Sequence, residues 1–193
     1  MKRNSFAPAL FAAVLLAMSP ALALAQAAPK AQPEQEIGTR SASKAELDAF
    51  AKAKISVADA IAAAANHVKG GTVFEATFDA VGGPPAYKVK AYQNNAVWEG
   101  VVDAQTGAVI GNGTTTPESQ LDAEDQAEIA GLKRAATSLP QAVAIAEKRA
   151  AGKAMAAGLE ETAGKIVYEI VLVKNGATRK VVVDPMNGTV IKG

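Results

Sequence analysis

An internal repeat is the feature that most limits what this chain can fold into. Three segments of the first half of the 193-residue sequence recur, in the same order, in the second half. They are Ile55–Ile61 with Thr137–Val143, Ala86–Val89 with Val167–Ile170, and Val101–Ile110 with Val182–Ile191. The first match is offset by 82 residues and the other two by 81, so the copies differ in length by one residue. Ordered matches of this kind predict two copies of one supersecondary unit.

Each copy begins with the signals of a helix. Ser56 and Ser138 stand where an N-cap residue accepts a main-chain N–H, and each is followed three positions later by a side chain that can bond back. Alanine-rich runs follow both caps and end near Gly70-Gly71 in copy one and Gly152 in copy two. Glycine ends helices because it adopts the left-handed conformation without strain. We therefore expect one helix in each copy.

Strand and turn signals follow each helix. In copy one, the segments 73–81 and 86–92 read as strands, and a bend is expected at Asn94-Asn95. In copy two, the strands 165–173 and 178–184 flank Asn175-Gly176, a pair favoured in tight hairpins. Each copy then closes on a turn that starts with Asp and ends with Gly, namely Asp103–Gly107 and Asp184–Gly188. The predicted fold class is α+β, with two repeated modules, each a helix packed on a small antiparallel β-sheet.

The repeats define the expected domain organisation. We expect a signal peptide at 1–25, a flexible spacer at 26–42, a first module with a preceding short helix at 43–112, a linker with a connecting helix at 113–136, and a second module at 137–193. A capping box at Ser43 predicts the short helix at 44–53. Residues 111–117 read as a loop by composition. The connecting helix should turn Leu121, Ile129 and Leu132 inward.

The N-terminus resembles a secretory signal peptide. Lys2 and Arg3 precede an uncharged apolar stretch, and Ala23-Leu24-Ala25 supplies a cleavage site near Ala25. The stretch is shorter than the roughly 20 apolar residues that a spanning helix needs, so no stable membrane insertion is expected after cleavage. An uncleaved anchor is the alternative. The expected location is periplasmic or secreted.

Composition excludes several classes of site and partner. The sequence has no cysteine, which removes disulfides, thiol catalysis, zinc–thiolate sites and lipoprotein acylation. The 20 basic and 19 acidic residues give a net charge of +1, which becomes −1 when Lys2 and Arg3 leave with the signal peptide. Nucleic acid and anionic membranes require a clustered positive field, so neither is expected as a partner.

Catalytic signals are scarce. His67 is the single histidine, and no G-x-S-x-G motif accompanies it, so it reads as a structural or solvent-facing residue. The acidic group Asp122, Glu124, Asp125 and Glu128 lacks the spacing of a calcium loop and reads as a solvated helix face. Gly82-Gly83 is followed by two prolines, which cannot donate N–H groups to a phosphate. We therefore expect no catalytic residue, no bound metal and no cofactor.

A candidate partner-binding face lies on the middle strand of copy one. Lys88, Lys90 and Tyr92 alternate with residues that face the helix, and Trp98 on the neighbouring strand could join Tyr92 in an exposed aromatic patch. The alternative is that Trp98 belongs to the core, as large aromatic side chains in small domains usually do.

The repeated motifs resemble the PepSY family. The strand motif is Tyr87–Lys90 in copy one and Tyr168–Val171 in copy two, and the closing turns carry Asp103, Gly107, Asp184 and Gly188. The resemblance covers roughly 55–111 and 137–193 and implies a cystatin-like shape. By family association it also implies a role in restraining peptidases or in binding other proteins outside the cytoplasm. The sequence has no H-E-x-x-H motif, so a restrained peptidase would be a separate chain.

These features predict a non-catalytic, exported protein-binding module. Its partner would be another envelope or secreted protein, with a restrained peptidase as the specific form of the hypothesis. The alternatives are a structural scaffold of an envelope assembly and a binder of a small ligand. An enzyme is the least favoured class.

Overall fold

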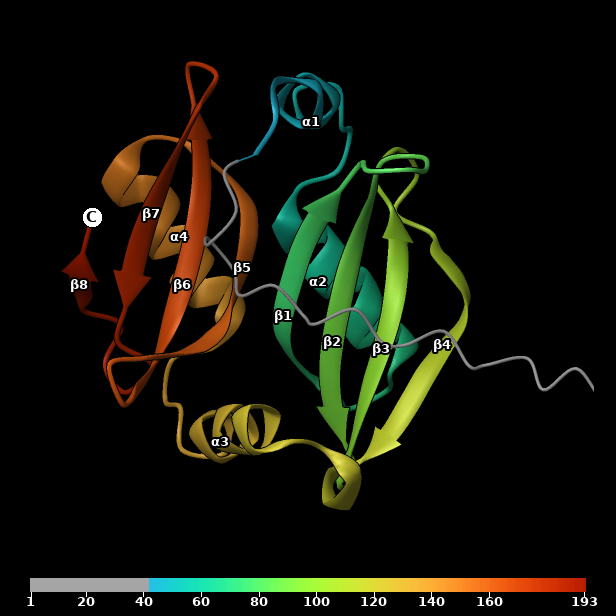
Figure 1. Cartoon of the computed structure of the whole chain (residues 1–193), viewed down its shortest axis with the longest axis vertical. Coiled ribbons are helices and arrows are strands. Elements are labelled where there is room, and N and C mark those ends of the chain that lie inside the picture. The colour runs from blue at the N-terminus through green and yellow to red at the C-terminus, as the bar shows by residue number, and fades with distance from the viewer. Residues whose placement is uncertain (1–41) are drawn as a thin grey trace, which may run out of the picture. The chain divides into compact units, whose positions relative to one another are not determined.

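The computed structural model describes residues 42–193, which form an α+β fold (Figure 1). The predicted signal peptide and all but the last residue of the predicted spacer lie outside the described residues. The elements of copy one are α1 (Lys44–Phe50), α2 (Val57–His67), β1 (Thr72–Asp79), β2 (Ala86–Gln93), β3 (Ala96–Asp103) and β4 (Val109–Pro117). The short 3-10 helix η1 (Glu118–Gln120) and α3 (Ala123–Leu132) follow. Copy two contains α4 (Leu139–Ala150), β5 (Lys153–Thr162), β6 (Lys165–Lys174), β7 (Ala177–Val183) and β8 (Val190–Lys192).

The eight strands between residues 42 and 193 belong to one antiparallel sheet. Their order is β4-β3-β2-β1-β5-β6-β7-β8, so each copy contributes four consecutive strands and the copies join where β1 meets β5. At this junction Ala76 lies opposite Ala157, and both side chains are fully buried. These two alanines are 81 residues apart, which makes them equivalent positions of the repeat. The two copies are therefore joined by strand pairing.

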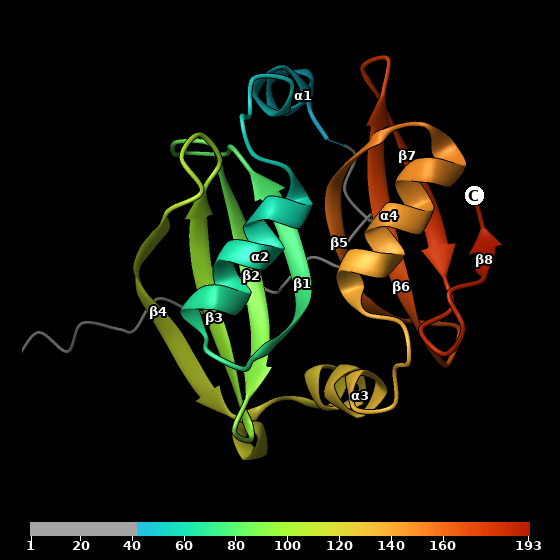
Figure 2. The same cartoon turned by 180° about the vertical axis from the view of Figure 1, so that it is seen from behind.

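The helices α2 and α4 cover the same face of the sheet (Figure 2). On β2 the side chains of Tyr87, Val89 and Ala91 point toward α2 and are 1% exposed or less. Their equivalents on β6, Tyr168, Ile170 and Leu172, are completely buried beneath α4. Each Å² of apolar surface removed from water stabilises the fold by about 25 cal/mol, so this buried face is the main source of stability.

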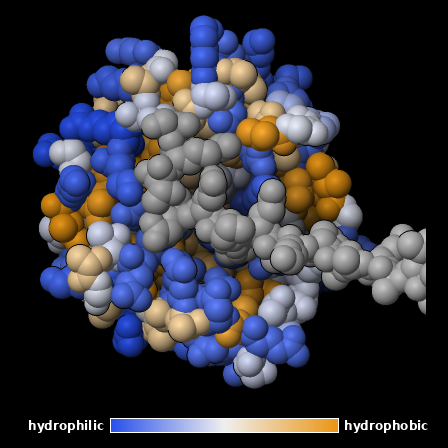
Figure 3. Space-filling model, viewed as in Figure 1, coloured by the Kyte–Doolittle hydropathy of each residue, from blue (hydrophilic) through white to orange (hydrophobic). Residues whose placement is uncertain are grey.

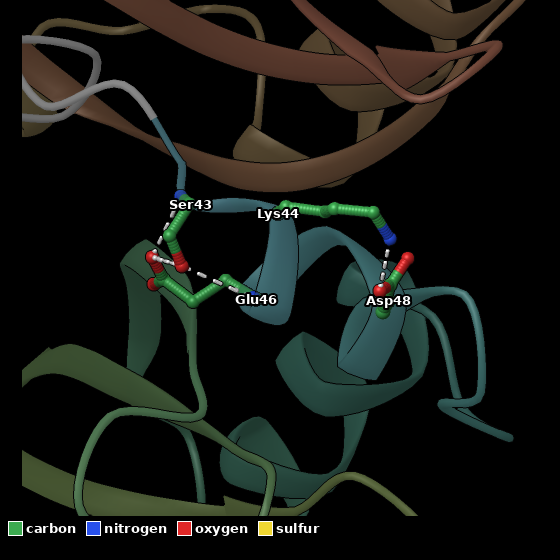
Figure 4. A network of polar contacts seen from close by, with 4 residues as sticks. All are labelled: Ser43, Lys44, Glu46 and Asp48. Carbon is green, nitrogen blue, oxygen red and sulfur yellow. Dashed lines mark hydrogen bonds and ion pairs between the residues drawn. The ribbon is translucent and has the colours of Figure 1, made fainter.

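Side-chain caps start the helices where the sequence predicts. Ser43 accepts the N–H of Glu46 at 3.2 Å while the Glu46 carboxylate accepts the Ser43 N–H at 3.1 Å, and Lys44 pairs with Asp48 at 2.6 Å (Figure 4). Ser56 and Ser138 cap α2 and α4 in the same reciprocal way. These bonds satisfy N–H groups that the first helical turn leaves without a partner.

The repeated tyrosine and the closing turn together hold the start of each module's helix. The Tyr87 hydroxyl donates to the carbonyl of Ile55 at 2.9 Å, and the Tyr168 hydroxyl donates to the carbonyl of Thr137 at the same distance. The carbonyl of Ala104, next to Asp103, accepts the N–H groups of residues 54 and 55. The carbonyl of Pro185, next to Asp184, accepts those of residues 136 and 137. The motifs shared by both copies therefore have structural roles.

The hairpin turns require left-handed backbone, and two of them were predicted. Asn94 and Asn95 have φ of 51° and 59°, and Asn175-Gly176 has 51° and 74°. The turn at Ala163-Gly164, with φ of 52° and 74°, was not predicted, because alanine is a poor left-handed residue.

The segment 111–117 was expected to be a loop but forms most of β4. Its residues 114–117 pair with β3, from Glu99 opposite Thr114 to Ala96 opposite Pro117. Glycine and threonine composition suggested a loop, but main-chain pairing and the packing of the Trp98 ring against Gly113 favour a strand at this edge. The inward positions of Ile129 and Leu132 on the connecting helix are confirmed, and Leu121 is also buried but lies before that helix, between η1 and α3.

No helix between residues 42 and 193 combines the length and the apolar character that crossing a lipid bilayer requires.

Candidate functional site

The sheet face opposite α2 and α4 is rich in charged side chains. Because neighbours on a strand point to opposite faces, Lys88, Lys90 and Tyr92 of β2 turn away from α2. Lys88 forms an ion pair with Asp79 at 2.6 Å, and Lys90 lies 3.4 Å from Glu75 and 3.5 Å from Asp125. Figure 3 shows hydrophilic residues over much of the visible part of this face, with apolar residues between them. We call Lys88, Lys90 and Tyr92 the open-face residues; the Lys88 side chain is 68% exposed, whereas that of Lys90 is only 12% exposed.

Tyr92 belongs to a polar network at the end of this face. Its hydroxyl lies 2.5 Å from the Glu118 carboxylate, which also pairs with Lys133 at 2.7 Å. The Lys133 ammonium sits 4.9 Å from the centre of the Tyr92 ring, which is a cation–π distance. Hydrogen bonds from Lys133 and Tyr92 lower the pKa of Glu118. The network fixes the Tyr92 ring beside an open depression lined by Asn95, Glu118, Ser119 and Gln126.

Trp98 is not part of this face. It pairs with Ala91, so its indole points toward the helices, where it is 6% exposed. The indole N–H donates to the carbonyl of Asn112 at 2.9 Å. Gly100 and Gly113 leave the space that the ring occupies. The predicted patch of Trp98 with Tyr92 is therefore not formed, and the core position is the correct alternative.

His67 has a structural environment. It is the last residue of α2, and its ring centre lies 5.2 Å from that of Trp98. Among residues 42–193, no hydroxyl or carboxylate bonds to its imidazole. The described part of the chain therefore offers His67 neither a nucleophile to activate nor a group to orient it.

An acidic cluster joins α3 to β5, and its burial was not predicted. Carboxylate oxygens of Glu124, Glu128 and Glu160 lie within 4.8 Å of one another. Glu128 and Glu160 are each 6% exposed, whereas Glu124 is open to solvent. Burial, reinforced by the charge of Glu160, raises the pKa of Glu128 to about 9. The expectation of a fully solvated helix face was wrong for Glu128 because α3 packs across β5, a contact that helical periodicity cannot reveal.

The comparisons with known proteins agree with the repeat. The family model described as "Peptidase propeptide and YPEB domain", PepSY, matches residues 54–112 and again 138–193. The chain belongs to the PepSY family. Both PepSY copies contain the tyrosine-to-carbonyl bond and the closing turn. The inferred resemblance is thereby confirmed.

A solved structure and the curated proteins add little to this assignment. The structure, of a "putative lipoprotein" from Clostridium difficile 630, is 24% identical and has a TM-score of 0.41. The match covers 73% of this chain and 93% of that one. A search of the curated proteins found no match.

Proposed function

We propose that this PepSY protein is an exported, non-catalytic protein-binding module that contacts its partner through the open-face residues. The supporting observation is a difference between the two copies. At positions that face the helices, the copies carry similar residues, such as Tyr87 and Tyr168. At the open-face positions, 81 residues apart, Lys88 corresponds to Glu169, Lys90 to Val171 and Tyr92 to Val173. Packing against the helix thus limits which residues can occupy the helix-facing side, whereas the residues on the open face of copy one differ in charge and polarity from those of copy two.

The chemistry of the open face suits recognition of a protein. Lys88 is exposed and held in place by Asp79, and Tyr92 combines an apolar ring with a fixed hydroxyl. Tyrosine is enriched at protein interfaces and a lysine suits their polar rim, and a positioned side chain loses little conformational freedom on binding. The family description names peptidase propeptides, and this supports a peptidase as the partner that the module restrains.

The test uses the chain from residue 26 to residue 193, immobilised and exposed to a periplasmic extract of its source. Lys88→Glu reverses the charge beside Asp79, and because the Lys88 side chain is 68% exposed, solvent screens the new repulsion and the fold should tolerate it. Lys148→Glu on α4 changes the charge equally on the helical side of the sheet and is the matched control.

We expect wild type and Lys148→Glu to retain a peptidase that Lys88→Glu loses, and purified wild type to inhibit that peptidase. Equal retention by all three proteins would contradict the assigned surface. A stable partner that is not a peptidase, with no inhibition of envelope peptidases, would favour the scaffold instead.

A further inference from the structure

Three glutamates from two separate elements converge beside the sheet. Glu124 and Glu128 are four residues apart on α3 and so lie on the same side of the helix, and Glu160 comes from β5. Their carboxylate oxygens all lie within 4.8 Å of one another. Because these residues are distant in sequence, the spacing of a calcium loop is absent even though the donors meet.

Glu128 is the unusual member of this group. It is 6% exposed, and within residues 42–193 its carboxylate makes no hydrogen bond and no ion pair. One of its carboxylate oxygens lies within 4.8 Å of an oxygen of Glu124 and of Glu160. A buried carboxyl group without a hydrogen-bonding partner costs free energy, and an adjacent negative charge increases that cost.

We propose that Glu124, Glu128 and Glu160 bind a calcium ion. Calcium prefers carboxylate oxygens at about 2.3–2.6 Å, so two ligands on opposite sides of the ion are about 4.6–5.2 Å apart. The spread of the three oxygens fits within that span. Glu124 is exposed, which provides an entry path and leaves room for water ligands.

The neighbouring charges are compatible with a cation at this point. The charge of Lys90 acts on Glu128, and its ammonium lies 3.4 and 3.5 Å from the carboxylates of Glu75 and Asp125. The negative charges of Glu75 and Asp125 add to the field at Glu128. A bound cation would therefore fasten α3, which connects the two PepSY copies, to β5. This inference does not depend on the proposed partner.

Calcium titration of the chain from residue 26 to residue 193 tests the site directly. Binding is measured by calorimetry, and the melting temperature Tm is measured at 0 and 10 mM calcium. We expect one site, and at ten times its Kd a rise in Tm of about 3–6 °C. Glu128→Gln should abolish the rise, because the amide oxygen is a weaker calcium ligand than a carboxylate. Glu160→Gln should also abolish the rise.

Glu161→Gln is the matched control, since Glu161 follows Glu160 on β5 but is exposed and outside the cluster. It should respond to calcium as wild type does. An unchanged Tm in wild type with no calorimetric heat, or an equal rise in Glu128→Gln and Glu160→Gln, would overturn the proposal. An equal response to 10 mM magnesium would overturn the assignment of calcium, because magnesium requires shorter, octahedral coordination.

Discussion

The Tyr168 hydroxyl donates a 2.9 Å hydrogen bond to the main-chain carbonyl of Thr137, 31 residues earlier in the chain. Thr137 immediately precedes the N-cap of α4, so the bond ties the middle strand of the sheet to the start of the helix. Burial raises the pKa of Tyr168 to about 12, so the hydroxyl remains a donor throughout the physiological range. Tyr87 makes the same bond to Ile55 in copy one.

Tyr168→Phe removes this donor and leaves the buried carbonyl without it. We expect the free energy of unfolding to fall by about 1–3 kcal/mol, the usual cost of a buried polar group that loses its partner. Urea unfolding monitored by circular dichroism measures the change. Tyr92→Phe is the control, because it deletes a hydroxyl that bonds to the partly exposed Glu118, and its loss should be smaller. Equal losses of unfolding free energy in the two variants would show that the bond to Thr137 stabilises the protein no more than the bond from Tyr92 to Glu118 does.

Gly100→Ala should disturb the single tryptophan. A Cβ at position 100 would overlap with the Trp98 ring, so the ring must leave its place or the strand must shift. Overpacking of this kind costs about 1–3 kcal/mol. We expect a lower Tm and a red-shifted tryptophan emission maximum as the indole gains exposure.

Gly83→Ala is the control for that experiment, because nothing lies within 4 Å of the added carbon. Both its Tm and its emission should match wild type. Unchanged emission in Gly100→Ala would contradict the observed packing of the ring over Gly100.

Ala163→Asn should stabilise the protein. Ala163 has φ of 52° at the first turn position between β5 and β6, where asparagine is less strained than alanine. The change would produce the Asn-Gly pair already present at Asn175-Gly176. We expect a gain of roughly 0.5–1 kcal/mol in thermal or urea unfolding. The same substitution at the exposed strand position Ala177 should give no gain, and a gain at both positions would point to a cause other than turn conformation.

Acid should weaken the closing turn of copy one. The Asp103 carboxylate accepts the N–H groups of Gln105 and Thr106 and the Thr106 hydroxyl, and these bonds lower its pKa below the ordinary value. The stabilisation is therefore present above the unfolded-state pKa of about 3.9 and is lost as the pH falls through the lower folded-state pKa. Between pH 6 and pH 2.5, Tm should fall more steeply for wild type than for Asp103→Asn. Parallel curves would contradict this role.

The secondary structure was predictable where local chemistry and periodicity agree. Ser56 and Ser138 begin their helices as expected, and Asn175-Gly176 forms the expected turn, because capping and left-handed turns depend on neighbours in the sequence. Because the helix cap and the hairpin turn each occur in both copies of the repeat, each copy supported the prediction made for the other. The alternation of residues along β2 also placed Lys88, Lys90 and Tyr92 on the face opposite the helix.

Features that depend on long-range packing were not predictable. Trp98 was a candidate for the exposed patch with the core as the alternative, and its pairing with Ala91 across the β2–β3 hairpin places it in the core. The burial of Glu128 depends on β5, which lies beyond the connecting helix in sequence. The 111–117 segment has the composition of a loop but pairs along β3. In each case the deciding partner is a strand outside the local segment.

The pairing of Ala76 with Ala157 relates the two PepSY copies as subunits are related in a symmetric homodimer. Equivalent residues meet across antiparallel strands, which is the arrangement of an isologous interface around a local two-fold axis. In a dimer of separate modules, that interface would dissociate on dilution. Within one chain its effective concentration is on the order of millimolar, so the eight-stranded sheet should persist at any protein concentration. Because the two modules are separate segments of one chain, their sequences need not be identical. Each module can therefore carry different residues on its exposed surface.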